Sequence, residues 1–454
     1  YIRTECGSTC CKDYFVSLDL PTRKINYCIE LRTMNLKKIQ QLANSPLLEI
    51  NKEQRNMLVT TLNDIIPNTP RYREYIPMLK SLDESNVVDF LQTLPIITKQ
   101  EVMLNSQLFH RLDLSGKKYD IRTGGTSGEI LSFQRIRSEY DVENIHISYC
   151  WSTMEIQLGV DKGVVLTNRP PKQSLDGFTH LDRNNMLWVT CNGNTPSHWE
   201  KVYRTIDQFN PKYLRGYGSL VGEFFNQMKN LNFDVPVSIH SIAYSSDPIQ
   251  PSELKQMRNV FPGKILSLYG QTERVTMGIT CEYGNRFHLL PTYGYTEIIR
   301  EDGSIIDGPN EIGQIISTSL YPRACSFVRY ATGDLGCWVE DKCPCGKHGP
   351  SISKFLQRSH EKVVNNKHES FVIGRRKSFL NFRDHLPVGV GVQFLQRTPG
   401  RLSVFLQTVE QDSKLYDLAL SYLRTEFDVD VEFVTEPLLN KNGKRTLLIK
   451  EFES

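Results

Sequence analysis

Short apolar runs alternate with amphipathic stretches through the middle of the chain, and this alternation limits the fold more than any other feature. Residues 163–166 and 265–269 are two such runs, each of strand length. The pattern extends from about residue 120 to residue 319, and helix-like spacing of apolar residues fills the stretches between the runs. Alternating strands and helices are typical of layered α/β domains, so we predict an α/β fold.

The length and the ends of the chain predict a division into parts. At 454 residues the chain exceeds a single compact core, so we expect at least two domains. Residues 1–35 are weakly periodic and form an N-terminal appendage of unknown role, whereas residues 36–62 have helical spacing. Strand patterns at 402–406 and 429–434 flank a helical pattern at 415–427. We therefore predict a large domain over 36–357 and a small, mobile α+β domain over 358–454.

Composition and charge exclude several classes of protein. Hydrophobic residues make up 39% of the chain and charged residues 23%, as in ordinary globular proteins. The net charge is +3, and lysines and arginines are scattered among acids, so nucleic acid is not an expected partner. No apolar run approaches the roughly 20 residues of a membrane helix, and the first residues lack a signal-peptide core. We expect a cytoplasmic protein without a membrane partner.

The cysteines favour reduced thiols or a metal site over a disulfide framework. There are 11 of them, too few for a disulfide scaffold of this length and odd in number. Cys6, Cys10 and Cys11 cluster near the start, but no second pair of ligands lies nearby, so we interpret them as incidental thiols.

One helix start is marked by a capping-box pattern. Ser197 is followed three positions later by Glu200, ahead of the apolar residues Val202, Ile206 and Phe209. This pattern predicts a helix whose N-cap is Ser197.

Residues 119–128 end a strand-like run in a loop of three glycines with three hydroxyl residues. Glycines let backbone amides approach an anion closely, and hydroxyls donate to phosphate oxygens without adding bulk. Flexible loops often have the same composition, and no Walker-type Gly-Lys-Ser/Thr ending follows. The loop alone therefore suggests phosphate binding without deciding it.

Two further motifs follow the loop along the chain: Tyr-Gly-Gln-Thr-Glu at 269–273 and Tyr-Ala-Thr-Gly-Asp at 330–334. With the glycine-rich loop, they resemble the motifs of the adenylate-forming superfamily, which contains acyl-CoA synthetases, luciferases and peptide-synthetase adenylation domains. The chain is most similar to the phenylacetate-CoA ligase branch with its capsule-biosynthesis relatives, and residues 213–219 and 392–396 support that branch. The resemblance covers the chain from about Leu36 to its end. It implies a large multi-subdomain adenylation domain followed by a mobile α+β domain.

The resemblance implies a role for each matching residue. The loop that closes on the ATP phosphates corresponds to Thr123, Gly124, Gly125, Thr126, Ser127 and Gly128. Tyr269 would stack on adenine, Thr272 would face the α-phosphate and Glu273 would hold Mg²⁺. Asp334 would accept hydrogen bonds from both ribose hydroxyls, and Arg358 would contact the nucleotide. Ser246 and Asp247 would line the adenine pocket, and Lys444 would reach the substrate carboxylate and the α-phosphate.

The chain departs from the family pattern at several positions. Glu129 and Ile130 replace the usual Lys-Pro after the loop, and an acid there repels a triphosphate. Arg135 and Arg137 either compensate for this acid or are exposed surface arginines. Gln357 replaces a glycine, and His360 stands at the hinge, where relatives have an acid or a lysine. The pair at 374–375 lies too late in the chain to be the matching Gly-Arg.

Four soft ligands flank the two motifs. Cys281 and His288 follow the first motif, and Cys343 and Cys345 follow the second. Three thiolates and one imidazole suit tetrahedral zinc with no open position, so a bound ion would be structural. Cys337 and His348 are alternative ligands, and four unrelated reduced residues are the other interpretation.

These features predict an AMP-forming ligase that uses ATP and Mg²⁺ to activate a carboxylic acid as an acyl-adenylate. The acceptor would be coenzyme A, an amine or a carrier protein supplied in trans. Aromatic residues at Trp151, Trp188, Tyr217 and Tyr244 either line a pocket for an aryl or aryl-acetic acid or pack in the core. The alternative, suggested by Glu129, Gln357 and His360, is a catalytically silent adenylate-fold protein that binds a nucleotide or a partner.

Overall fold

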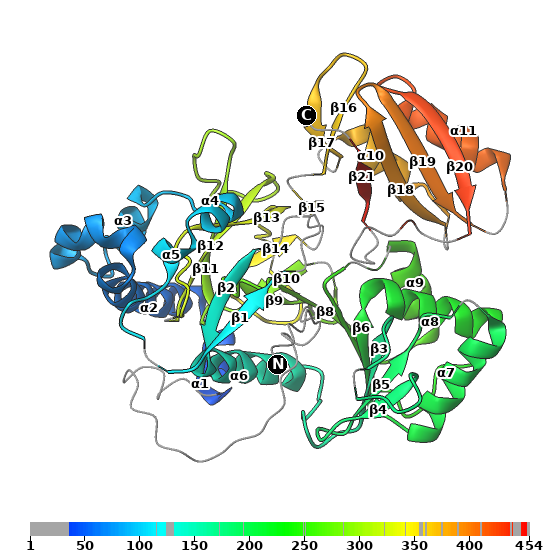
Figure 1. The fold of residues 1–454 in the computed structure, drawn as a ribbon, viewed down its shortest axis with the longest axis horizontal. Coiled ribbons are helices and arrows are strands. Elements are labelled where there is room, and N and C mark those ends of the chain that lie inside the picture. Colours follow the sequence, from blue (N-terminus) through cyan, green and yellow to red (C-terminus); the bar gives the residue numbers. More distant parts are fainter. Residues whose placement is uncertain are drawn as a thin grey trace, which may run out of the picture.

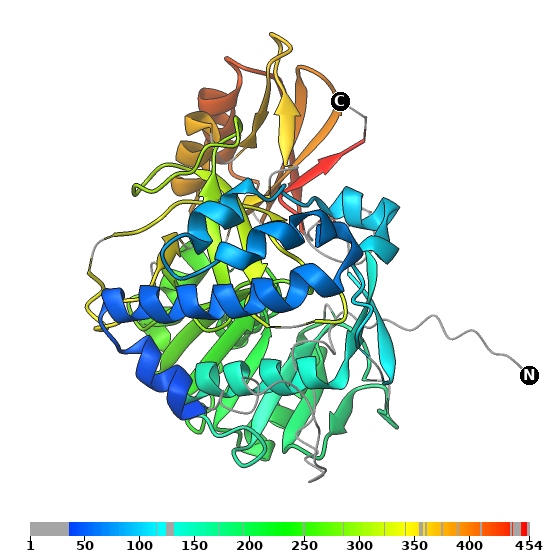
Figure 2. The ribbon, with the colours of Figure 1, turned by 90° about the vertical axis from the view of Figure 1, so that its left-hand side faces the viewer.

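The chain was analysed as a computed structural model that describes residues 36–451 apart from 115, 124–130, 172, 194, 248, 250, 285, 322, 341, 354–356, 359–360, 374–375, 388–389, 409–410, 436–437 and 439–445. The appendage predicted at 1–35 lies outside the described residues. Figures 1 and 2 show a large α/β body and a smaller body formed by the C-terminal part of the chain. Within the described residues, no helix has the length and apolar character needed to span a bilayer.

Helices form the first described part of the chain and lie together on one side of the large body (Figure 2). They are α1 (Leu36–Ala43), α2 (Leu47–Asn68), the 3₁₀ helix η1 (Pro70–Ser81), α3 (Val87–Thr93), α4 (Lys99–Leu104) and α5 (Ser106–Phe109). The predicted helical spacing over 36–62 is confirmed, and it divides into two helices at Pro46. Leu58, Leu62 and Tyr72 pack in one buried cluster with Tyr330.

A nine-stranded sheet forms the centre of the large body, in the order β14-β10-β9-β8-β7-β6-β3-β5-β4. Its parallel strands are β3 (Gly163–Thr167), β5 (Met186–Thr190), β6 (Tyr213–Tyr217), β7 (Ser241–Ser245) and β8 (Lys264–Gly270). Antiparallel strands flank them: β4 (Thr179–Leu181), β9 (Met277–Ile279), β10 (Arg286–Leu289) and β14 (Ser351–Ser353). The apolar runs at 163–166 and 265–269 are thus confirmed as strands.

Helices cover both faces of this sheet. On one face lie α7 (Pro196–Phe209), α8 (Gly218–Asn230) and α9 (Pro251–Val260), and on the other lies α6 (Arg137–Ser152). Val202 and Phe224 pack in the first core, and Ile147 and Trp151 pack in the second. The parallel strands β6, β7 and β8 all end at the same edge of the sheet. Ligands of open α/β sheets bind at this carboxyl edge, where the motif at 269–273 begins.

The predicted cap of α7 is wrong by two residues. Thr195 is the N-cap, and its hydroxyl accepts from the amide of His198 at 3.2 Å. Pro196 follows at the first helical position, where its missing amide proton costs no hydrogen bond. Glu200 instead pairs with Arg204 at 2.6 Å.

Two smaller sheets complete the large body. The strands β1 (Lys118–Arg122) and β2 (Ser132–Ile136) pair as an antiparallel hairpin, and the glycine-rich sequence connects them in the chain; its residues 124–130 are outside the described part. A four-stranded sheet contains β11 (Gly294–Ile299), β12 (Gly313–Ser319), β13 (Tyr330–Gly336) and β15 (Gln357–Arg358), in that order. Strand β13 carries the motif at 330–334, so this sheet brings it towards the nine-stranded sheet (Figure 1).

The C-terminal body has its own sheet and core. Its elements are β16 (Lys362–Val364), β17 (Ser370–Val372), α10 (Lys377–Asp384), β18 (Gly391–Thr398), β19 (Arg401–Gln407), α11 (Ser413–Leu423), β20 (Asp428–Val434) and β21 (Leu448–Lys450). The predicted strands at 402–406 and 429–434 are confirmed. The predicted helix ends at Leu423, four residues earlier than expected, and Phe427, directly before β20, enters the same core.

Candidate active site

Two tyrosine–carboxylate pairs join the motif at 269–273 to the motif at 330–334. The Tyr269 hydroxyl donates to Asp334 Oδ2 at 3.0 Å, and the Tyr330 hydroxyl donates to Glu273 Oε1 at 2.7 Å. Each motif begins with a tyrosine and ends with an acid four positions later, so the pairing is reciprocal. Three of the residues predicted to bind the nucleotide or its cation therefore lie together at the carboxyl end of β8.

The local backbone of β13 fixes the carboxylate of Asp334. Gly333 has φ +77°, a conformation in which a side chain would be strained. Thr332 donates its hydroxyl to the carbonyl of Ile315 at 2.9 Å and accepts from the Asp334 amide at 3.1 Å. Asp334 itself is buried, and the backbone of Arg358 lies opposite it on β15. The carboxylate therefore sits on a rigid strand.

The turn that carries Thr272 and Glu273 is held from the other side by two buried arginines. Arg135 on β2 donates to the Thr272 carbonyl and is only 1% exposed. Arg274 has φ +57° and directs its guanidinium towards the carbonyl of Glu139, at 3.3 Å. Arg135 is thus buried beneath the turn, so the interpretation of it as an exposed arginine is wrong. Arg137 is exposed and lies 3.9 Å from Asp141.

Two acids on α6 form a buried network with charged and polar groups behind this turn. Glu143 is 3.5 Å from Arg274 and accepts a hydrogen bond from the Tyr293 hydroxyl, and Glu139 is 3.7 Å from Arg323. All four charged side chains are almost completely buried. Two acids thus balance two arginines, which compensates part of the cost of removing the charges from water. The network ties α6 to Arg274, directly after the first motif, and to Arg323, which precedes the second.

His146 belongs to the same network as a neutral group. Burial lowers the pKa of His146 to about 4. Its two ring nitrogens lie 2.9 Å from the carbonyl of Val142 and 3.0 Å from the hydroxyl of Thr292. One ring nitrogen therefore donates and the other accepts.

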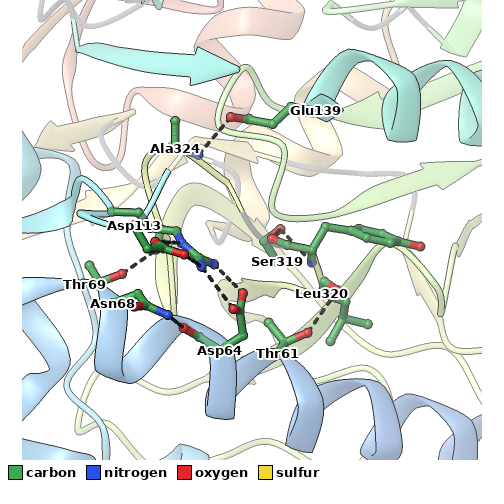
Figure 3. Close-up of polar contacts among 12 residues, drawn as sticks. Thr61, Asp64, Asn68, Thr69, Asp113, Glu139, Ser319, Leu320 and Ala324 are labelled. Carbon is green, nitrogen blue, oxygen red and sulfur yellow. Dashed lines mark hydrogen bonds and ion pairs between the residues drawn. The ribbon is translucent and has the colours of Figure 1, made fainter. Parts of the chain in front are cut away.

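The segment that leads into β13 is anchored to α2, to α6 and to Arg111. Thr61 on α2 donates to the carbonyl of Leu320 at 3.0 Å, and Glu139 accepts from the amide of Ala324 at 2.9 Å (Figure 3). The guanidinium of Arg111 donates hydrogen bonds to the carboxylates of Asp64 and Asp113. The backbone amide of Arg111 donates to the carbonyl of Ala324 at 3.0 Å. These contacts hold the segment from Leu320 to Ala324, which leads towards Tyr330 on β13.

The remaining nucleotide-binding predictions are only partly within the described residues. Thr123 closes the base of the glycine-rich loop, since its hydroxyl accepts from the amide of Leu131 at 3.0 Å. Gly124, Gly125, Thr126, Ser127 and Gly128 lie outside the described residues, as do Glu129, Lys444 and His360. Ser246 has φ +74° and is exposed, whereas Asp247 accepts from the backbone amide of Ser219 at the start of α8.

Of the four aromatic residues expected near a substrate, two are buried in the core and two are partly exposed. Trp151 and Tyr244 are buried, and Trp151 packs against Tyr213 with ring centroids 5.4 Å apart. Trp188 and Tyr217 are half-buried. Trp151 therefore has the core role that was the alternative to a pocket wall.

The structure gathers Cys281, His288, Cys343 and Cys345 into one cluster. Their ligand atoms all lie within 4.8 Å of one another. The Sγ atoms of Cys281 and Cys343 are 3.5 Å apart, and Cys345 Sγ is 3.4 Å from His288 Nε2. His288 lies on β10 and Cys281 follows β9, so neighbouring strands present two of the ligands. Among the described side chains, these four meet, and the alternatives Cys337 and His348 are not in the group.

The cluster fits a tetrahedral metal ion. With metal–sulfur bonds of about 2.3 Å, neighbouring sulfur ligands stand roughly 3.8 Å apart, close to the spacing seen here. The other ring nitrogen of His288 lies 3.2 Å from the Ser351 hydroxyl, which orients Nε2 towards the thiols. Burial lowers the pKa of His288 to about 4, so the imidazole stays neutral and can bind a metal.

The sequence predicted no role for Tyr330, although the residue opens the motif at 330–334. Its partner Glu273 lies 57 positions away in the chain. The parallel between the two pentapeptides, each with tyrosine first and an acid last, was the available signal. Glu139 and Glu143 left a weaker signal, because their spacing of four places them on one face of α6.

Comparison with known proteins adds structural relatives but no sequence family. Neither a family model nor a curated protein matches the chain. Among solved structures, 2-hydroxyisobutyryl-CoA ligase in its postadenylation state has a TM-score of 0.69 at 14% identity, covering 90% of this chain and 91% of that one. The two chains therefore share a fold. The same ligase in its thioesterification state gives a TM-score of 0.57 at 14% identity, over 91% and 92% of the two chains. The predicted α/β fold with a separate C-terminal unit is confirmed.

Proposed function

We propose that the protein is an AMP-forming ligase that activates a carboxylic acid with ATP and passes the acyl group to coenzyme A or an amine. The observation that carries this proposal is the reciprocal pairing of Tyr269 with Asp334 and of Tyr330 with Glu273. It gathers an aromatic ring and two carboxylates at the edge of the sheet where nucleotides bind in such folds. The acyl-CoA ligase fold supports the same reaction.

Each group in this arrangement has a chemical task. The Tyr269 ring, which packs against Phe287 at 5.5 Å, offers a flat face to adenine. Asp334 is an acceptor for two ribose hydroxyls. Glu273 would hold Mg²⁺, which neutralises phosphate charge. Ser246, Asp247 and Arg358 complete the nucleotide site, and the residues at 123–128 close over the phosphates.

In the first half-reaction a carboxylate oxygen of the acid attacks the α-phosphorus of ATP. The bond from the α-phosphorus to the bridging oxygen breaks, pyrophosphate leaves and acyl-AMP forms. Lys444 stabilises the charge shared between the carboxylate and the phosphate, and Thr272 faces the α-phosphate. The protein contributes positioning and charge stabilisation, without a covalent intermediate on the chain.

In the second half-reaction a thiol or an amine attacks the acyl carbonyl, AMP leaves and the nucleophile loses a proton. We propose that residues 358–454 rotate about the stretch from Arg358 to His360, which removes Lys444 and admits the acceptor. Strand β15 pairs with β13, whereas β16 pairs with β17, which supports a hinge directly after Arg358. A carrier protein is a third acceptor. The proposed acid is aryl or aryl-acetic, with Trp188 and Tyr217 beside it.

We propose further that Cys281, His288, Cys343 and Cys345 hold a structural zinc ion. Three thiolates and an imidazole fill a tetrahedral shell and leave no position for substrate. The ion would join β9 and β10 to the segment before β14. Its role is therefore to stabilise the edge of the sheet next to Phe287 and Tyr269.

The test separates the two half-reactions in matched lysine variants. Lys444→Ala should abolish exchange of labelled pyrophosphate into ATP but retain ATP binding and acyl transfer from synthetic acyl-AMP. Lys441→Ala, in the same loop, is the control and should retain both half-reactions. Equal loss of both half-reactions in Lys444→Ala would contradict the assigned role. ATP binding without exchange in the wild-type protein would instead favour a silent binding protein.

A further inference from the structure

Tyr330 is held in place by hydrogen bonds of its neighbouring peptides and by packing of its ring. The backbone on either side of Tyr330 forms hydrogen bonds with Ile97. The Ile97 amide donates to the Arg329 carbonyl at 2.9 Å, and the Ala331 amide donates to the Ile97 carbonyl at 2.8 Å. The Tyr330 ring packs against Phe327 with centroids 5.0 Å apart, and the residue is 1% exposed. The hydroxyl is thus aimed at Glu273 by a fixed ring on a fixed backbone.

Arg329, the preceding residue, anchors this backbone. Its guanidinium donates to both carboxylate oxygens of Glu297 at 3.1 Å and to the carbonyls of Gln92 and Leu94 at 2.9 and 2.7 Å. The pair with Glu297 is buried, and such bidentate contacts are geometrically specific. Arg329 therefore fixes the position from which Tyr330 reaches Glu273.

Glu273 is held at its other end as well. Its backbone belongs to the turn in which the Thr272 carbonyl accepts a hydrogen bond from Arg135. The side chain is half-buried, and Tyr330 contacts one carboxylate oxygen, Oε1. A carboxylate fixed at one oxygen has a defined direction for the other, and a metal ion with strict octahedral geometry requires such a direction.

We infer that Tyr330 is a positioning residue for the cation: its hydroxyl orients the Glu273 carboxylate so that the second oxygen meets Mg²⁺ bound to ATP. This inference rests on the proposed role of Glu273. Tyr330 touches neither the nucleotide nor the metal in this account. Its effect should appear in the contribution of Mg²⁺ to nucleotide binding and not in metal-free binding.

The experiment measures the Kd of the unreactive analogue α,β-methylene-ATP by calorimetry, once in MgCl₂ and once in EDTA. The ratio of the two constants is the enhancement by Mg²⁺. Tyr330→Phe should lower this ratio roughly tenfold or more, as expected when a hydrogen bond to a charged acceptor is lost, and leave the Kd in EDTA unchanged. Glu273→Gln should lower the ratio at least as much.

Tyr72→Phe is the matched control. Tyr72 lies in the same buried cluster, but its hydroxyl contacts the backbone of Ser326 and Val328, each at 3.2 Å. It should lower the melting temperature without changing the ratio. If the ratio is normal in Tyr330→Phe but reduced in Glu273→Gln, the inference about Tyr330 is wrong and the proposed function is unaffected. The inference is also wrong if Tyr72→Phe lowers the ratio as much as Tyr330→Phe does. A normal ratio in Glu273→Gln removes the metal role of that residue, and with it part of the proposed function.

Discussion

Asp334→Asn is the substitution whose effect follows most directly from the site. Asparagine has the shape of aspartate, and its amide oxygen can still accept from the Tyr269 hydroxyl, which now lies 3.0 Å from Asp334. The charge is lost, and the amide nitrogen takes the place of one acceptor oxygen. The strand and the neighbouring motif should therefore stay in place while ribose binding weakens.

The expected loss comes from the two ribose hydroxyls. Hydrogen bonds to a charged group contribute about 1.5–3 kcal/mol each, and those between neutral groups about 0.5–1.5 kcal/mol. The difference over two bonds is about 2–3 kcal/mol, which corresponds to a rise in Kd of roughly 30- to 150-fold. Calorimetric titration with ATP and Mg²⁺ measures this rise directly.

Combining the Asp334→Asn substitution with deoxy analogues of ATP tests whether the lost binding free energy comes from the ribose hydroxyls. Wild-type protein should bind 2′-deoxy-ATP and 3′-deoxy-ATP less tightly than ATP, whereas Asp334→Asn should discriminate much less between the three nucleotides. An unperturbed melting temperature shows that the fold is intact. Unchanged ATP affinity in the variant, or undiminished discrimination, would refute the assignment of Asp334 to the ribose.

Three further predictions concern the zinc cluster, a buried histidine and the hinge. Protein purified without chelator should contain about one equivalent of zinc, Cys345→Ser should lose it and Cys337→Ser should keep it; less than a third of an equivalent in the wild type contradicts the site. Because the folded-state pKa of His146 lies near 4, below its ordinary 6.5, the unfolded chain binds a proton first as the pH falls. The unfolding free energy should thus drop between pH 6.5 and 4 by roughly 3 kcal/mol more in wild type than in His146→Gln, and parallel curves for the two would exclude this contribution. His360→Pro should keep adenylation and lose acyl transfer, since proline fixes φ at a rotating position; normal transfer would place the hinge elsewhere, near Gly374.

The fold could be predicted where one residue pattern determines one element. The apolar runs that become β3 and β8 are buried on both faces of a parallel sheet, so their composition alone marks them. The start of α7 could not be predicted in this way, because both Thr195 and Ser197 carry a hydroxyl that can cap a helix. Pro196 favours Thr195 as the cap, since proline suits the first helical position, directly after the cap.

The site could be predicted only as far as its motifs are local. The spacing of Cys281, His288, Cys343 and Cys345 indicated a metal cluster, and the structure brings these residues together. Arg135 gave no such indication, because its partner, the Thr272 carbonyl, lies 137 positions away and only tertiary packing buries the guanidinium. The pairing of Tyr330 with Glu273 was hidden for the same reason. Contacts between motifs depend on how two sheets meet, and neither motif contains that information.

The most direct test of the account is acid-dependent exchange of labelled pyrophosphate into ATP. Wild-type protein with ATP and Mg²⁺ should be assayed against a panel of aryl, aryl-acetic and short aliphatic acids, with Glu273→Gln as the matched inactive control. The account predicts exchange that requires one class of acid and that falls sharply in the control. ATP binding without exchange for any acid, or exchange that is equally fast in Glu273→Gln, would contradict it.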